Sequence, residues 1–175
     1  HSFNEIFIKS YIIFFLLFGF CSANESIRYV DINHIVNNST SGKKLNQIIE
    51  NKNKKIISEL NNLGKKLEEK KNKIVNQKNI LKKDELDKLI KNYEIEVKKF
   101  DEIRKKKRDD FNNFSINSKK KIIDLLNPLI TNYLKKESIQ ILLQKDKIIF
   151  GDDKLDITKE ILKIFNEKHS KINFE

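Results

Sequence analysis

The chain has 175 residues and carries 36 Lys and Arg against 25 Asp and Glu, which gives a net charge of +11. Charged residues make up 35% of the composition, and there are only four Gly, one Pro, and neither Trp nor Met. Such a composition favours helix and argues against a compact β-sandwich or barrel, so we expect a mainly α protein.

The first 23 residues have the pattern of a secretory signal peptide. The apolar run at 11–20 is too short to span a bilayer as a mature helix, but it fits the core of such a signal. Small residues at Cys21 and Ala23 suit cleavage after Ala23. Lipidation of Cys21 is the alternative, and the bulky Phe20 argues against it. We therefore expect export of a mature chain that has no cysteine and needs no disulfide.

The mature chain begins with a β-prone run at 27–32. A polar loop at 37–42 follows, and its Thr40 or Ser41 would cap the first long helix. We assign residues 24–42 to the first part of a small β/α base.

Residues 43–136 predict two very long helices joined by a short polar break at 79–84. In both helices most apolar residues recur at steps of four and three, the heptad spacing of helices wound against a partner. The first series is Leu45, Ile49, Ile56, Leu60, Leu63, Leu67, Ile74 and Leu81, and the second is Leu86, Ile90, Tyr93, Val97, Phe100, Phe111, Phe114, Ser118, Ile122 and Leu125, with lapses at Arg104 and Lys107. The simplest partner for each helix is the other. Each has about 40 residues, which makes an antiparallel coiled-coil hairpin roughly 60 Å long that projects into solvent.

The positive charge is concentrated on this hairpin. Between Lys43 and Lys121 there are 25 basic and 13 acidic residues, a surplus of 12, so the rest of the chain is close to neutral. A basic surface of this kind suits an anionic partner such as nucleic acid, a lipid head group or an acidic polypeptide. The alternative explanation is an A+T-rich genome, which raises the frequency of Lys, Asn and Ile without selection for binding.

Residues 137–175 complete the base. The apolar runs at 139–143 and 147–150 predict a β-hairpin, and Asp156 would cap a final amphipathic helix. The base then has three strands per chain plus a terminal helix, with the helical hairpin inserted between the first and second strands.

A base of this size gives marginal stability alone, and three strands leave two open edges that invite pairing with another copy. We therefore predict an obligate homo-oligomer in which several sheets close into one β base. The apolar side chains expected at its contacts are Ile27, Tyr29, Ile141, Leu143, Ile148 and Phe150.

The order of strand, helical hairpin, β-hairpin and terminal helix behind a signal peptide resembles the Skp/OmpH family of periplasmic chaperones. The segments that carry the resemblance are Tyr29-Val30-Asp31, Ser41-Gly42-Lys43, Ile141-Leu142-Leu143, Ile148-Ile149-Phe150 and Asp156-Ile157-Thr158. The resemblance implies an ATP-independent holdase of the periplasm. It also implies a homotrimer whose three hairpins surround a cavity that holds unfolded outer-membrane proteins.

In such a holdase, a basic cage with scattered apolar side chains would attract an unfolded client and hold it by many weak contacts. Apolar residues beside the heptad seam are the expected contacts, together with basic residues near the break and in the second helix. The candidates are Val75, Ile80, Leu89, Ile103, Lys82, Lys83, Arg104 and Lys105. These apolar residues could instead pack within the coil or stand singly on the surface. An anionic lipid or lipopolysaccharide is a further partner for the basic surface, without assigned residues.

Two other classes of function compete with the holdase. A nucleic-acid-binding protein would use the basic run 104–108, but acidic residues flank that run, no aromatic stacking surface accompanies it, and export separates the chain from DNA. A structural or adaptor coiled coil of the cell envelope would bind a defined folded partner.

An enzyme is not expected. The mature chain has only His34 and His169 as histidines, no glycine-rich phosphate loop and no spacing typical of metal ligands, so we predict no cofactor and no metal.

Overall fold

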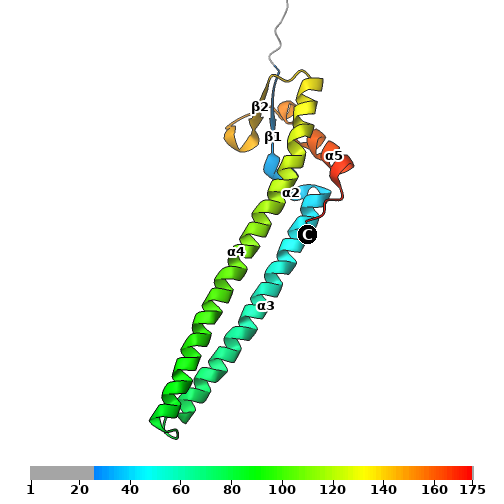
Figure 1. Cartoon of the computed structure of the whole chain (residues 1–175). Coiled ribbons are helices and arrows are strands. Elements are labelled where there is room, and N and C mark those ends of the chain that lie inside the picture. Colours follow the sequence, from blue (N-terminus) through cyan, green and yellow to red (C-terminus); the bar gives the residue numbers. More distant parts are fainter. Residues whose placement is uncertain (1–25, 175) are drawn as a thin grey trace, which may run out of the picture.

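The computed structural model describes residues 26–174, so the predicted signal peptide lies outside the described residues. Figure 1 shows a long two-helix hairpin, here called the arm, that projects from a small base. Along the chain the elements run β1, α2, α3, α4, β2, two short 3₁₀ helices and α5. The fold is mainly helical, as the composition predicted.

The arm consists of α3 (Thr40–Gln77) and α4 (Lys83–Lys136), which have 38 and 54 residues. At a rise of 1.5 Å per residue, their lengths are about 57 Å and 81 Å. The turn at 78–82 lies at the predicted break. α4 is longer than α3 because it continues beyond the start of α3 and enters the base (Figure 1), where Leu126 and Ile130 are buried.

Two helices alone cannot enclose their shared seam. Among the described residues of α3 and α4, the fully buried ones all lie near the base, and the apolar residues farther out are at best half-buried. Near the start of α4, Leu86 and Leu89 are half-buried while Ile90 is exposed, so Leu89 takes the place of Ile90 in the predicted seam. Steps of three and of four both fall near the seam of a helix with 3.6 residues per turn, so the heptad pattern did not decide between these neighbours.

The arm joins the base through a tight connection between α2 (Ile32–Asn38) and α3. Ser39, rather than the predicted Thr40 or Ser41, caps α3, because its Oγ accepts a hydrogen bond from the Gly42 N–H at 3.0 Å. A Cβ on Gly42 would lie only 1.9 Å from the carbonyl oxygen of Val36. The close contact of the two helices therefore requires glycine at this position.

The described sheet pairs β1 (Ile27–Val30) with β2 (Ile141–Gln144) in parallel, and Ile27 lies opposite Ile141. β1 is shorter than the predicted run because Asp31 ends it and caps α2, its Oδ1 accepting from the His34 N–H at 2.7 Å. Parallel neighbours need a long crossover connection, and the whole arm supplies it.

The predicted β-hairpin at 139–150 is wrong, since no third strand forms within the described residues. Lys145–Lys147 form a 3₁₀ helix after β2, and Ile148 to Phe150 have no regular structure. The other edge of β1 is occupied instead by the segment before α5, where the Ile157 N–H donates to the Tyr29 carbonyl at 3.0 Å.

The hydrophobic core lies in the base and the root of the arm. α5 (Thr158–His169) contributes Ile161 and Phe165, and α4 contributes four residues of its last third. The buried apolar residues of this core are Val30, Ile35, Val36, Leu45, Ile122, Leu126, Leu129, Ile130, Ile157, Ile161, Phe165, Ile172 and Phe174. The base thus fixes the root of a long arm whose outer part has no comparable core.

Candidate functional site

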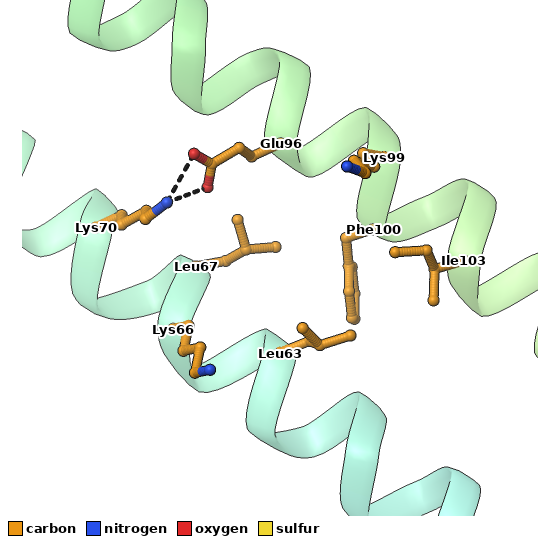
Figure 2. A pocket seen from close by; sticks show the side chains of 8 residues that line it. All are labelled: Leu63, Lys66, Leu67, Lys70, Glu96, Lys99, Phe100 and Ile103. Carbon is orange, nitrogen blue, oxygen red and sulfur yellow. Dashed lines mark hydrogen bonds and ion pairs between the residues drawn. The ribbon is translucent and has the colours of Figure 1, made fainter.

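One hollow on the arm lies between α3 and α4, in the outer half of the arm. Figure 2 shows it from close by. Its volume is about 430 Å³, and its floor is made of Leu63 and Leu67 of α3 with Phe100 and Ile103 of α4. Figure 2 shows these four side chains pointing into the space between the two helices. Four charged residues complete the lining, namely Lys66, Lys70, Glu96 and Lys99. The hollow therefore combines an apolar floor with a mainly basic rim.

Two more hollows continue along the same side of the arm. The one toward the tip, of about 330 Å³, shares Lys70 and Glu96 with the first, so the two adjoin. The one toward the base has about 290 Å³. Its Glu59 and Asp110 lie one heptad from Lys66 and Ile103, which places it on the same side. We call this side the grooved side and define it by Lys52, Glu59, Lys66 and Lys73 of α3 and Leu89, Glu96, Ile103 and Asp110 of α4.

On the opposite side of the seam lies a smaller hollow, of about 220 Å³. It is lined by Ile57 and Leu60 of α3 and by Arg104 and Arg108 of α4, among others. The two sides of the arm are thus unequal, and the grooved side offers the longer continuous surface.

Two ion pairs join the helices on the grooved side. Lys70 donates to both carboxylate oxygens of Glu96 at 2.6 and 2.5 Å, and Lys107 lies 2.5 Å from Glu59. The hydrogen bond and charge of Lys107 hold the pKa of Glu59 below its ordinary value. Lys107 was one of the two lapses in the predicted seam, and this partner explains how a lysine fits there.

The candidate client contacts from the sequence do not form one cluster. Leu89 and Ile103 line the hollows of the grooved side. Val75 and Ile80, with 60% and 81% of their surface exposed, lie at the outer end of the arm, where Lys82 and Lys83 begin α4. Arg104 lines the hollow of the opposite side, and Lys105 is exposed.

Some residues of this surface were missed by the sequence reasoning. Lys66 and Lys99 form the rim of the hollow in Figure 2, and their heptad positions beside Leu63 and Phe100 could have identified them. Three further apolar residues of the arm are exposed, namely Ile57, Ile95 and Ile116.

The residues predicted as oligomer contacts also differ in how far they are exposed. Ile27, Ile141, Leu143 and Phe150 are exposed, and Ile148 is half-buried. Ile149, not among the predicted contacts, is fully exposed beside Phe150.

Tyr29 is the exception, because only 5% of its surface is exposed and its own chain covers it. Gly151 packs against its ring, Lys145 lies 5.7 Å from the ring centroid, and its hydroxyl donates to the Asp152 carbonyl at 3.3 Å. Burial, together with the charge of Asp156, raises the pKa of Tyr29. Its side chain therefore supports the base from inside.

Among the described residues, no group of three or more His, Cys, Asp or Glu is placed to hold a metal ion. The same part of the chain contains no helix that is both long and apolar enough to cross a membrane.

Comparison with known proteins gives two positive findings. A family model described as "Outer membrane protein (OmpH-like)" matches residues 26–165. A crystal structure of an OmpH-like outer membrane chaperone from Caulobacter crescentus CB15 superposes with a TM-score of 0.79 at 13% sequence identity, covering 87% of this chain and 90% of that chain. At this identity the likeness shows a shared fold. No curated protein sequence matches the chain.

Proposed function

Since this chain belongs to the OmpH-like outer membrane protein family, we propose that it is an ATP-independent holdase chaperone that protects unfolded outer-membrane proteins in the periplasm. Membership of the family supports a chaperone role. The finer proposal is that the protein is a homotrimer and that clients bind in a cavity between its three arms.

The observation that carries the proposal is the surface of the arm. A surplus of 12 positive charges lies between Lys43 and Lys121, and the hollows between α3 and α4 expose apolar side chains next to lysines. An unfolded β-barrel strand exposes alternating apolar side chains. Long-range attraction by the lysines and many weak apolar contacts would capture such a chain quickly and release it without nucleotide hydrolysis.

The homotrimer is supported by the exposed apolar residues of the base. Ile27, Ile141 and Leu143 are exposed on one small sheet, and Ile149 and Phe150 are exposed in the segment that follows it. Apolar surface gathered in this way marks an interaction site, and the outer edge of β2 can pair with another chain. Contacts among three copies would bury these side chains and hold the three arms around one cavity.

The arm tip favours a second candidate function, contact with an anionic lipid or lipopolysaccharide. Between positions 70 and 83 there are six lysines and no acidic residue, and Ile80 at the turn is exposed. Lysines around an exposed apolar side chain suit the surface of an anionic membrane. Sedimentation with anionic vesicles, but not with zwitterionic ones, would support this function. Equal sedimentation with both would contradict it.

The test of the holdase is the aggregation of an unfolded outer-membrane β-barrel after dilution from urea, with and without a stoichiometric amount of the mature chain. We expect suppression of light scattering at low salt and weaker suppression at high salt, because the attraction is partly electrostatic. An absence of suppression at low salt would contradict the proposal.

Binding of a folded barrel serves as the control for the alternative function, a structural or adaptor coiled coil. A holdase prefers the unfolded barrel, whereas an adaptor would bind a folded partner and ignore the unfolded chain. Neither of these two functions, as proposed, uses nucleic acid, a cofactor or a metal.

A further inference from the structure

We propose that the grooved side of the arm is a binding track for one extended transmembrane β-strand of an unfolded client. This inference rests on the proposed holdase function and adds to it a place and a ligand class. The ligand is an extended segment that alternates apolar side chains with polar or acidic ones.

The length of the grooved side fits this ligand. Its α3 border runs from Lys52 to Lys73, and 21 residues of helix extend about 32 Å. An extended chain rises about 3.3 Å per residue, so the track accommodates nine or ten residues. A transmembrane β-strand has about 9–11 residues, so one strand would occupy the track from end to end.

The chemistry of the floor fits one face of such a strand. Successive side chains of a strand point to opposite sides, so the apolar ones all point the same way. Leu63, Leu67, Phe100 and Ile103 in the middle hollow, with Ile74 and Leu89 toward the tip, offer an apolar surface to receive them. The hollows have about 290 to 430 Å³ each, which is at the lower end of the range for ligand sites.

The charge of the rim fits the other face of the strand. Glu96 and Glu59 already pair with Lys70 and Lys107 across the helices. In the described part of the chain Lys66 and Lys99 have no acidic partner, although they flank the hollow of Figure 2 from opposite helices. Their long side chains can reach carboxylates on the solvent-facing side of a bound strand. The track is thus complementary to an acidic amphipathic segment and repels a basic one.

Neighbouring lysines provide a matched test. Lys66 and Lys99 border the track, whereas Lys65 and Lys98 lie one residue earlier, where the heptad directs them away from the seam. The variant K66E/K99E and the control K65E/K98E therefore change the net charge equally and differ only in position. All four side chains are exposed, so both variants should fold, which circular dichroism will check.

The probe is a labelled peptide of one strand length that alternates leucine with glutamate, measured by fluorescence anisotropy with the mature chain. We expect K66E/K99E to weaken binding about tenfold and K65E/K98E to change it less than about twofold, since reversal at the rim replaces two attractions for the peptide's carboxylates by repulsions. A peptide that alternates leucine with lysine should bind the wild type at least about tenfold more weakly. Equal losses in both variants would show attraction by bulk charge and would overturn the track.

A second measurement locates the peptide directly. The mature chain has no cysteine, so single cysteines at Lys99 and Lys98 can be crosslinked to a peptide that carries a thiol-reactive group. Preferential crosslinking at position 99 is expected, and equal yields would contradict the track. The aggregation assay separates the two proposals. If the wild type protects an unfolded barrel but the two double variants behave alike, the result supports the holdase function and contradicts the binding track. If the wild type gives no protection, the function itself fails.

Discussion

The base and the arm contain the same kinds of apolar residue, but these residues are buried to different extents in the two regions. In the base, apolar residues from β1, α2, α4 and α5 meet from several directions, and Ile35, Ile161 and Phe165 are completely buried. In the arm, only two helices meet, and even the central Phe100 and Ile103 stay half-buried on the floor of a hollow. The difference in the number of packed elements, more than the difference in sequence, decides how much apolar surface reaches water.

This difference separates stability from binding. The buried apolar core lies in the base and the root of the arm, so the outer arm can leave apolar and basic side chains accessible. A well-packed arm would be more stable and would have less surface to offer to a client. Variants that make the same kind of change in the base and in the arm test this difference.

The largest effect is expected from removing a buried aromatic ring. Phe165→Ala in the base should lower the free energy of unfolding by about 3–5 kcal/mol, because a completely buried ring leaves a cavity. The matched change Phe100→Ala in the arm should cost only about 1 kcal/mol, since that side chain is half-buried. Urea unfolding at one fixed protein concentration measures both. Equal costs would show that the arm contributes a core of its own.

The next effect concerns the exposed apolar residues of the base. Phe150 is 89% exposed, and burying it against another copy would contribute about 1.5–3 kcal/mol per chain. Phe150→Ser should therefore shift the assembly toward monomers, whereas Ile116→Ser on the arm should leave the mass unchanged. Light scattering after size exclusion measures the mass of each. A trimeric Phe150→Ser protein at low concentration would contradict the assigned contact.

Two glycines offer a third comparison. Gly42→Ala should destabilise the protein by about 1–3 kcal/mol, because the new methyl group would collide with the Val36 carbonyl at the root of the arm. Gly64→Ala in the middle of α3 should instead stabilise it by about 0.5–1 kcal/mol, since no atom lies within 4 Å of the added carbon. Thermal unfolding distinguishes the opposite signs. A stabilising effect at Gly42 would mean that α2 can move away from α3.

The smallest effect is expected from the ion pairs on changing pH. The pKa of Glu59 is held below its ordinary value of 4.5 by the hydrogen bond and charge of Lys107. A carboxylate whose pKa is lowered by folding contributes stability above its unfolded pKa, and this stability is lost as pH falls through the folded pKa. Glu59→Gln should therefore be less stable than the wild type at neutral pH. The difference should vanish as the pH is lowered below 4.5.

Asp156 in the base provides the matching measurement. Burial acts to raise its pKa, but hydrogen bonds from Lys145 and Thr158 outweigh it, so its pKa also lies below the ordinary 3.8. Asp156→Asn should therefore also be less stable than the wild type at neutral pH, and the difference should shrink as the pH falls through the folded pKa, below 3.8. A difference that stays constant across a pH series of urea unfolding curves would contradict this environment.

The arm could be predicted from the sequence because its structure depends on local periodicity. Apolar steps of three and four residues identified both helices, and the polar residues near 79–84 located the turn between them. The base depends on contacts between distant segments. The run at 147–150 is as β-prone as the run at 139–143, and nothing local shows that Lys145 turns toward Asp156 or that Ile157 takes the edge of β1. The predicted third strand was therefore wrong, although both segments that form the sheet were identified.

The candidate site was predicted in part for a related reason. Leu89 and Ile103 were selected as apolar residues beside the seam, and both line the grooved side. Lys66 and Lys99 were overlooked because many lysines on the arm look equivalent in the sequence. Their positions relative to the partner helix distinguish them, and those positions depend on how α3 and α4 align.

The parallel pairing of β1 with β2 has a consequence for the order of folding. Ile27 meets Ile141 only after the entire arm has been made, so the sheet closes a loop of more than a hundred residues. The arm itself needs only contacts between neighbouring turns and a short reversal at 78–82, which form quickly. Once α3 and α4 have paired along their length, their ends at the base bring β1 and β2 close to each other. This removes most of the entropic cost of closing the loop. We therefore expect the hairpin to form first and the base to assemble last.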